Sequence, residues 1–405
     1  MKHYLGLILV VLLGCTNSKN LTTKPNQPTK LKQGFWRLSL DIGNGKELPF
    51  NFNYENGLIT ILNADEMFKV SNVKFVNDSI YITMPLFNSR FDGKISDQNS
   101  FSGVWRNFSK GKNYAIPFKA EKDVNYRFFE KSLKYNQNPT GKWEVTFDDD
   151  YKAIGLFELQ KDNIITGTFI TETGDYRYLE GNLKQDSLFL SCFDGSHAFR
   201  FSGKINGDKI SGDFNSGNHY SDTWTAVKNE NFTLTDPNEL TYIKDGYEGI
   251  VFSLPDLDSN IVTFPSKRFE NKVIIIQIMG SWCPNCMDET KFLSGIYEKY
   301  KNEDLEIVSV AFETPKTFSG AVKSITKIKN HFNCGYTFLY GGSASKTKAN
   351  DVFPMLNHVM SFPTCILIGK DGKVKKIHTG FYGPGTGEYY EKYTKEFVAM
   401  LEGML

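Results

Sequence analysis

Short segments in which apolar and polar residues alternate fill the chain from Gly34 to about Val227. A period of two is typical of strands that bury one face and expose the other. Turn sequences such as NG, DG and GD separate the segments at intervals of roughly ten residues, as in small all-β domains. The pattern therefore predicts an all-β region, with strands in FWRLSL, SIYITMPLF, WEVTFD and SLFLSCF.

This β region repeats itself. GFW at 34–36 opens one run and GKW at 141–143 opens another, while SGVW at 102–105 matches SGDF at 211–214 near the end of each run. The two offsets nearly agree, which indicates a duplicated unit with about eight strands per copy. We therefore predict two β units, residues 33–120 and 139–229.

Each unit has the size of a small barrel, and its Gly-x-Trp opening followed by a meander is similar to lipocalin and avidin-like barrels. A pair of small sandwiches is the alternative. Four tryptophans could line a ligand surface, but we expect them to fill the cores, since large aromatic side chains are the usual core residues: Trp36, Trp105, Trp143 and Trp224.

After residue 230 the pattern changes to alternating strands and helices, which predicts an α/β domain over residues 240–405 with a parallel β-α-β unit. Predicted strands are Val273 to Ile278, Leu305 to Ala311, Tyr336 to Tyr340, Thr364 to Gly369 and Val374 to Thr379. Predicted helices are Met287 to Tyr300, Phe318 to Lys329, Ala344 to Leu356 and a C-terminal amphipathic helix from about Tyr390.

The chain opens with Lys2 and an apolar run of about ten residues, too short to span a bilayer and typical of a secretory signal. The run ends in LLGC, which looks like a bacterial lipobox, so we predict a signal peptide at 1–14 and lipidation of Cys15. An unlipidated signal peptide is the alternative. The polar residues 15–32 then form a flexible tether. We expect a membrane-anchored lipoprotein of the cell envelope, facing the periplasm.

Charge and cysteine content exclude several classes of protein. The 47 basic and 46 acidic residues give a net charge of +1, which argues against nucleic acid as a partner. Without Cys15 five cysteines remain, so a disulfide-stapled scaffold is not expected. His197 and His219 have no ligand cluster around them, and we predict no metal site.

Cys283 and Cys286 form a C-x-x-C pair directly after an apolar strand. At the start of a helix, unpaired N–H groups and the helix dipole favour a thiolate at Cys283, while Cys286 lies one turn on and can close a disulfide with it. Zinc would need two more ligands at matched spacing, and a purely structural disulfide would close too small a loop to add much stability. Redox chemistry is the preferred interpretation.

Three motifs carry a resemblance to a known family. They are F-x-L-x-D at Phe252, Leu254 and Asp256, GSWCPNCMDE at 280–289, and SFPTCILIGKDGKV at 361–374. Together they resemble the TlpA/ResA family of thioredoxin-fold, membrane-tethered thiol-disulfide oxidoreductases, over about residues 247 to 405. Gly280 and Ser281 replace the alanine-serine pair that is commoner in that family.

The resemblance implies roles for four further residues. Pro363 is expected to be the cis-proline that faces the cysteines, with the backbone of Phe362 presented to a substrate segment. Trp282 corresponds to the aromatic residue that shapes the docking surface. Glu289 matches an acidic position near the cysteines and could accept the proton of Cys286; the alternative is a solvated charge in the first helical turn.

These observations predict a lipid-anchored thiol-disulfide oxidoreductase that reduces protein disulfides. Cys283 attacks, Cys286 resolves, and the redox-active dithiol replaces any other cofactor. A membrane dithiol carrier would restore the reduced form. The alternative is a cell-envelope binding protein whose β region captures a ligand or partner and whose redox domain is accessory. A peroxidase is not expected, because the P-x-x-x-T-x-x-C motif is absent.

Overall fold

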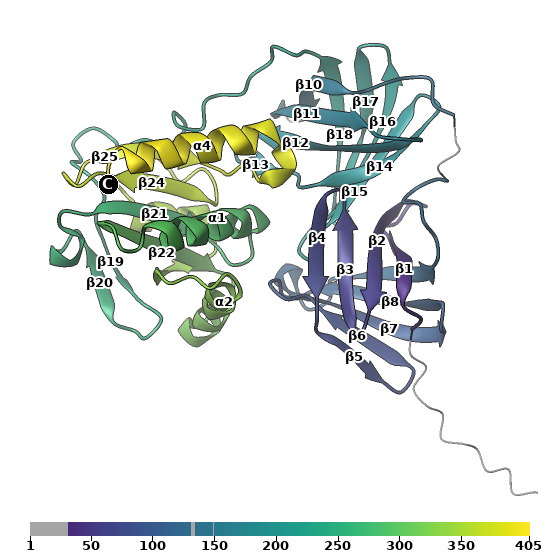
Figure 1. Cartoon of the computed structure of the whole chain (residues 1–405), viewed down its shortest axis with the longest axis horizontal. Helices are drawn as coiled ribbons and strands as arrows, with labels where there is room; N and C mark the ends of the chain where they lie inside the picture. The colour runs from purple at the N-terminus through teal and green to yellow at the C-terminus, as the bar shows by residue number, and fades with distance from the viewer. Residues whose placement is uncertain (1–30, 131–133, 149) are drawn as a thin grey trace, which may run out of the picture.

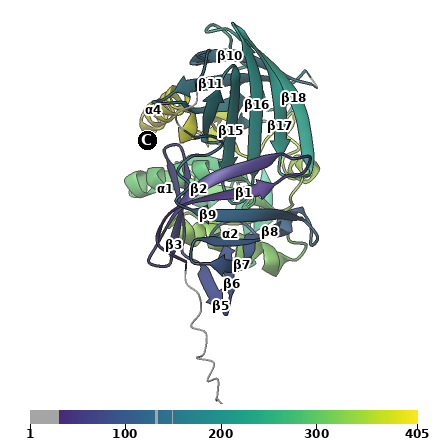
Figure 2. The same cartoon turned by 90° about the vertical axis from the view of Figure 1, so that its right-hand side faces the viewer.

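The computed structural model describes residues 31–130, 134–148 and 150–405, so the predicted signal peptide, most of the tether and Cys15 lie outside the described residues. Two barrel-like β sheets form the N-terminal region, and an α/β domain follows them (Figures 1 and 2). This is the predicted fold class. In Figure 1 the second of these sheets lies above the first and beside the N-terminal end of the last helix of the α/β domain.

The first sheet is an antiparallel meander with the strand order β4-β3-β2-β1-β9-β8-β7-β6-β5. No pairing joins β4 to β5 among the described residues, so this sheet curls without closing. Its strands are β1 (Gly34–Asp41), β2 (Glu47–Glu55), β3 (Leu58–Asn63), β4 (Glu66–Val70), β5 (Val73–Val76), β6 (Ser79–Thr83), β7 (Ser89–Asp97), β8 (Ser100–Asn107) and β9 (Ala115–Lys122).

The second sheet closes into a barrel, because β11 pairs with both β10 and β12. The short strand β13 is added at the edge of β12. Its strands are β10 (Gly141–Phe147), β11 (Lys152–Leu159), β12 (Ile164–Thr171), β13 (Gly174–Asp175), β14 (Leu179–Lys184), β15 (Ser187–Phe193), β16 (Ala198–Asn206), β17 (Lys209–Ser216) and β18 (Tyr220–Lys228).

Matching details at the start of each sheet support the predicted duplication. Gly34 and Gly141 both have a φ of +121°, a backbone conformation that L side chains rarely adopt. Two residues later, Trp36 Nε1 donates to the carbonyl of Lys32 at 3.1 Å, and Trp143 Nε1 donates to the carbonyl of Pro139 at 2.7 Å. Each copy thus begins with the same glycine turn and the same tryptophan bond to the fourth residue before it.

The four tryptophans are core residues, as expected. None is more than 1% exposed. Trp36 stacks on Phe52 with ring centroids 5.9 Å apart, and Trp224 packs edge-on against Phe169 at 5.2 Å. The interpretation of these rings as a ligand surface is therefore wrong.

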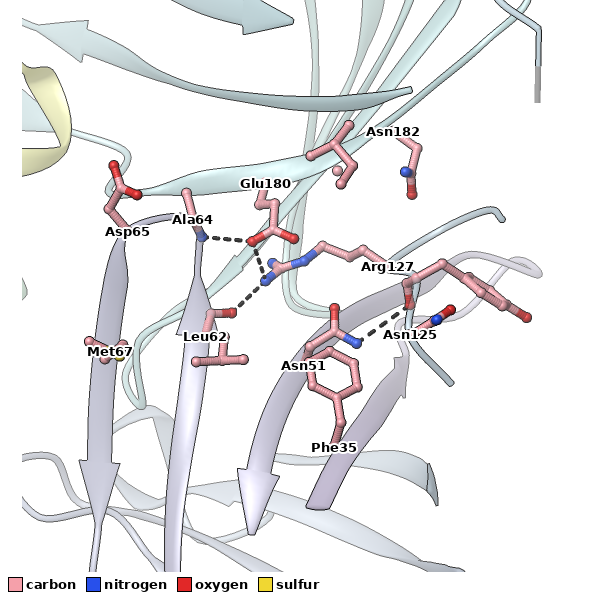
Figure 3. Close-up of a pocket in the computed structure, with 13 residues that line it drawn as sticks. Phe35, Asn51, Leu62, Ala64, Asp65, Met67, Asn125, Arg127, Glu180 and Asn182 are labelled. Atoms are coloured by element: carbon pink, nitrogen blue, oxygen red, sulfur yellow. Dashed lines mark hydrogen bonds and ion pairs between the residues drawn. The ribbon is translucent and has the colours of Figure 1, made fainter. Parts of the chain in front are cut away.

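A buried arginine joins the two barrel-like sheets (Figure 3). Arg127 lies in the segment that connects them and is 2% exposed; its Nη1 donates to the carbonyl of Ser191 at 2.9 Å, and its Nη2 contacts Leu62 and Glu180. Glu180 also accepts the backbone N–H of Ala64 at 2.7 Å. A hollow of about 420 Å³ opens beside this junction.

The α/β domain is built on a five-stranded sheet with the order β23-β22-β21-β24-β25. β21, β22 and β23 are parallel, whereas β24 and β25 are antiparallel to their neighbours. The strands are β21 (Val273–Met279), β22 (Leu305–Glu313), β23 (Thr337–Ser343), β24 (Thr364–Ile368) and β25 (Val374–Thr379), with a separate hairpin of β19 (Phe252–Pro255) and β20 (Ile261–Phe264).

Four helices of the described residues cover the sheet: α1 (Pro284–Tyr300), α2 (Phe318–His331), α3 (Lys346–Val352) and α4 (Glu388–Glu402). One core cluster combines Leu293 of α1, Ile325 of α2 and Leu401 of α4 with one face of β21. Ile276 and its neighbours on the other face pack with the hairpin and the residues after α3. β21 is therefore buried on both faces, as its unbroken apolar run predicts.

Two differences from the predicted elements have simple causes. The β19–β20 hairpin escaped prediction, because its strands are short and each carries polar residues. The helix predicted from Ala344 to Leu356 is only α3, since Pro354 disfavours helical geometry at Phe353. Within the described part of the chain, no helix is long and apolar enough to cross a membrane.

Candidate redox site

Cys283 lies at the carboxyl end of the central strand β21 and is the N-cap residue of α1. Its sulfur accepts the backbone N–H of Cys286 at 3.3 Å, which satisfies one of the unpaired donors at the start of the helix. Pro284 occupies the first helical turn, where no intrahelical N–H bond is needed. The strand, the turn and the helix that the sequence predicted around this cysteine are present.

Cys286 is completely buried, whereas Cys283 is 7% exposed. Burial, then the hydrogen bond and the charge of Cys283, raise the pKa of Cys286 well above its usual value. The two cysteines are thiols in the structure, as are the buried Cys192, Cys334 and Cys365. A disulfide between Cys283 and Cys286 remains a prediction.

The loop before β24 faces the first cysteine. The Phe362–Pro363 peptide bond is cis, as the family resemblance implied, and the Cys283 thiol donates to the carbonyl of Phe362 at 3.4 Å. Trp282 packs edge-on against Phe362 with ring centroids 5.6 Å apart, and its Nε1 donates to the carbonyl of Phe312 at 2.9 Å. Trp282, Cys283, Phe362 and Pro363 are thus brought together.

Gly280 has a packing reason to replace alanine. A Cβ atom at this position would lie 2.4 Å from Trp282 Nε1 and 3.0 Å from the carbonyl oxygen of Phe312. Any side chain would therefore collide with the indole where it bonds to Phe312.

Glu289 is completely buried, so the interpretation as a solvated charge is wrong. Gln277 Nε2 donates to Glu289 Oε2 at 2.9 Å, while Oε1 has no hydrogen-bond partner among the described residues. Burial raises the pKa of Glu289 to about 8, although the bond from Gln277 lowers it. The charge of Glu289 is also one of the factors that raise the pKa of Cys286. A carboxyl group with a raised pKa thus lies close to the Cys286 thiol.

Gln277 and Glu313 are site residues that sequence reasoning missed. Gln277 Oε1 accepts from Ser309 at 2.6 Å, which ties β21 to β22 beneath the cysteines. Glu313, at the end of β22, accepts the N–H of Ser281 at 2.8 Å and its hydroxyl at 2.5 Å. Burial raises the pKa of Glu313 to about 7. Two features of the sequence could have pointed to these residues. Gln277 is the single polar residue in the apolar run IIIQIM, and Glu313 is an acidic residue at the end of the neighbouring strand.

The second barrel contacts the C-x-x-C turn directly. Asn285, between Pro284 and Cys286, donates through Nδ2 to Asp175 Oδ2 at 3.2 Å. The same carboxylate oxygen accepts the N–H of Gly383 at 2.7 Å. Ser361, before the cis-proline loop, donates to the carbonyl of Thr173 at 2.9 Å. Sequence offered no signal for these contacts, because the partners lie about 110 to 210 residues apart in separately folded regions.

A buried arginine strengthens this contact. Arg177, 7% exposed, forms an ion pair with Asp288 of α1, and its Nη2 lies 2.8 Å from Glu66 Oε1 of the first sheet. Asp194 of the second barrel lies 4.0 Å from its Nε. Burial raises the pKa of Asp288 to about 6, although Arg177 lowers it. One guanidinium group therefore connects all three parts of the chain.

Among the described residues, no group of three or more His, Cys, Asp or Glu side chains could hold a metal ion. The chemistry that the arrangement offers comes from its thiols. A sulfur at a helix N-terminus, a buried second thiol and an adjacent carboxyl group are the parts that thiol-disulfide exchange requires.

Comparisons with known proteins agree with this chemistry. The Redoxin family model matches residues 244–391. Thiol-disulfide oxidoreductase ResA of Halalkalibacterium halodurans is 23% identical over 135 residues, which are 33% of this chain and 68% of that protein. ResA of Bacillus thuringiensis is 27% identical over 151 residues, 37% of this chain and 77% of that protein.

Among solved structures, a thioredoxin-family thiol:disulfide interchange protein from Chlorobium tepidum is 14% identical to this chain. The match covers 40% of this chain and 99% of that chain, with a TM-score of 0.30.

The α/β domain is a thioredoxin-fold thiol-disulfide oxidoreductase domain. This domain is similar in sequence to the TlpA/ResA-like oxidoreductases.

Proposed function

We propose that the chain reduces protein disulfides outside the cytoplasm through Cys283 and Cys286. The observation that supports this most directly is the position of Cys283: its sulfur caps α1, accepts the N–H of Cys286 and lies 3.4 Å from the carbonyl of Phe362. An attacking thiolate is stabilised at such a helix terminus, and a substrate segment can approach along the cis-proline loop.

The reaction consists of two exchanges. The Cys283 thiolate attacks one substrate sulfur, a mixed disulfide forms, and the other substrate sulfur leaves as a thiolate that takes up a proton. Cys286 then loses its proton and attacks Cys283 Sγ, which releases the second substrate thiolate and leaves a Cys283–Cys286 disulfide. Two electrons pass from the dithiol to the substrate, and a membrane dithiol donor returns them.

Glu289 is the group that we propose for accepting the proton of Cys286. The pKa of Cys286 is raised by burial, so this thiol needs a base when it resolves the mixed disulfide. With its pKa raised to about 8, Glu289 is mostly protonated at pH 7, and its ionised form, which becomes the major form above pH 8, is the one that accepts the thiol proton. Trp282 and Phe362 form the surface beside the attacking sulfur.

The N-terminal sequence supports a location in the cell envelope. Cleavage before Cys15 and acylation of that cysteine would tether the chain to a membrane on its periplasmic side. A Cys15→Ser variant is expected to leave the membrane fraction, and its persistence there after a carbonate wash would contradict the anchor.

The test of the redox function is a trapping experiment. Purified Cys286→Ser is expected to accumulate a mixed disulfide with insulin through Cys283, while Cys365→Ser, which removes only a buried thiol, should reduce insulin normally. Absence of both the adduct and insulin reduction by the unmodified chain would overturn the proposal. The direction of electron flow follows from the reduction potential: a value near −270 mV, roughly that of thioredoxin, indicates a reductase, and one near −120 mV an oxidant.

A further inference from the structure

A hollow of about 530 Å³ lies at one end of the second barrel, within the range of roughly 300–1,000 Å³ that is usual for ligand pockets. Residues from all three parts of the chain line it. Lys110 comes from the short 3-10 helix between β8 and β9 (Phe108–Lys110), Asn285 from the redox domain, and Tyr176, Phe199, Phe214 and Tyr220 from the barrel.

The hollow is continuous with the redox motif. Asn285 lies between Pro284 and Cys286 and is itself part of the wall. Gly174 of β13 packs so tightly on it that a Cβ atom would lie 2.8 Å from Asn285 Nδ2. A molecule in the hollow therefore lies next to the turn that carries both cysteines.

The barrel side of the hollow includes the rings of Tyr151, Tyr176, Phe199, Phe214 and Tyr220. Tyr176 packs edge-on against Phe199 and Phe214, with ring centroids 5.2 Å apart in both pairs. Tyr220 packs edge-on against Phe214 at 6.1 Å and is 50% exposed. A wall of such rings favours a further aromatic ring as the occupant, because aromatic pairs gain from stacked or edge-on packing beyond the burial of their area.

The charges around the hollow favour a neutral occupant. Among the described residues that line it, Lys110 and Asp175 carry opposite charges. Asp175 already accepts hydrogen bonds from Asn285 and Gly383, and Lys110 lies 3.0 Å from His219 Nε2. Neither sign of charge is in excess, so an ionic ligand gains little there.

We infer that this hollow binds an aromatic side chain of the polypeptide whose disulfide is reduced, a few residues from the cysteine that Cys283 attacks. The inference rests on the proposed reductase function and adds substrate selection by the second barrel. Clients with phenylalanine, tyrosine or tryptophan close to the reactive cysteine are then preferred over clients with small polar residues there.

The test follows the oxidation of the reduced full-length chain in detergent by excess disulfide. Two disulfide-linked peptide dimers are compared, identical except for Phe or Ser at the third residue after the cysteine. Each dimer oxidises one Cys283–Cys286 dithiol and yields two peptide thiols. Hydroxyethyl disulfide, which has no side chain for the hollow, reports the chemistry alone. The Phe peptide is expected to react about tenfold faster than the Ser peptide, or about 1.4 kcal/mol.

Two variants and a matched control test whether the preference for the Phe peptide arises in the hollow. Ser216→Trp fills the hollow from β17 and should make the two peptides react equally, while the rate with hydroxyethyl disulfide stays unchanged. Ser211→Trp, on the exposed side of the same strand, should keep the tenfold preference. Tyr220→Ala removes an exposed ring at the rim and should weaken the preference without filling the hollow.

The outcomes separate the two proposals. Equal rates for the two peptides with the unmodified chain would overturn the inference about the hollow but not the reductase function. The same holds if the full preference for the Phe peptide survives in both Ser216→Trp and Tyr220→Ala. If neither peptide nor hydroxyethyl disulfide oxidises the chain, the reductase function fails, and the pocket inference fails with it.

Discussion

Arg177 of the second barrel forms a buried ion pair with Asp288, two residues after Cys286 on helix α1. Glu66 and Asp194 share the same guanidinium group. Removing one partner of a buried ion pair leaves the others desolvated and unpaired, which typically lowers stability by roughly 3–5 kcal/mol.

We therefore expect Arg177→Met to lower the free energy of unfolding by about 3–5 kcal/mol in urea denaturation. Arg106→Met is the control, because Arg106 pairs with Asp92 on a partly exposed surface, where ion pairs contribute about 1 kcal/mol or less. Equal losses in the two variants would contradict a special role for Arg177.

Glu289 should make stability depend on pH. Its pKa of about 8 in the folded chain exceeds the usual 4.5, so between these values the folded state holds more protons than the unfolded state. The free energy of unfolding then falls as pH rises, by at most about 1.4 kcal/mol per pH unit.

Glu289→Gln cannot ionise and should reduce this fall between pH 5 and pH 8, as measured by denaturation at several pH values. Glu298→Gln, an exposed change on the same helix, should keep the original slope. An unchanged slope in Glu289→Gln would show that the carboxyl group is already ionised at pH 5.

Two glycines should respond to alanine in opposite directions. At Gly280 a methyl group collides with Trp282 and the Phe312 carbonyl, so Gly280→Ala is expected to lower stability by roughly 1–3 kcal/mol. At Gly295, inside α1, nothing lies within 4 Å of an added Cβ, and Gly295→Ala should raise stability by up to about 1 kcal/mol. Thermal denaturation of both variants tests the packing of Trp282, and a neutral Gly280→Ala would contradict it.

The thiols should differ sharply in reactivity. Cys283 is partly accessible at the helix terminus, whereas Cys286 is completely buried and its pKa is raised. Pulsed alkylation of the reduced chain at pH 7, followed by peptide mass mapping, should modify Cys283 first and leave Cys286 and Cys365 unmodified until the chain unfolds. Equal labelling of Cys283 and Cys286 would contradict this geometry.

Local patterns were sufficient to predict most of the fold. Strand and helix periodicity located the sheet of the redox domain, and the repeated Gly-x-Trp revealed the duplication, because both signals arise from contacts between nearby residues or along one face of one element. The proposed catalytic residues Cys283 and Cys286 follow from a short motif for the same reason.

Contacts between distant segments could not be predicted in this way. Asp175 and Arg177 lie in an ordinary polar turn, and only the docking of two separately folded regions brings them to Asn285 and Asp288. The burial of Glu289 also depends on side chains from other elements, such as Gln277. The hollow beside the C-x-x-C turn has the same origin, since three regions of the chain contribute to it.

The single guanidinium group shared by Glu66, Asp194 and Asp288 has a consequence for how the chain melts. If any one part unfolds, charged groups of the others lose their partner while still buried, so partial unfolding is penalised. The three parts are therefore expected to behave as one cooperative unit, with a single calorimetric transition in place of three.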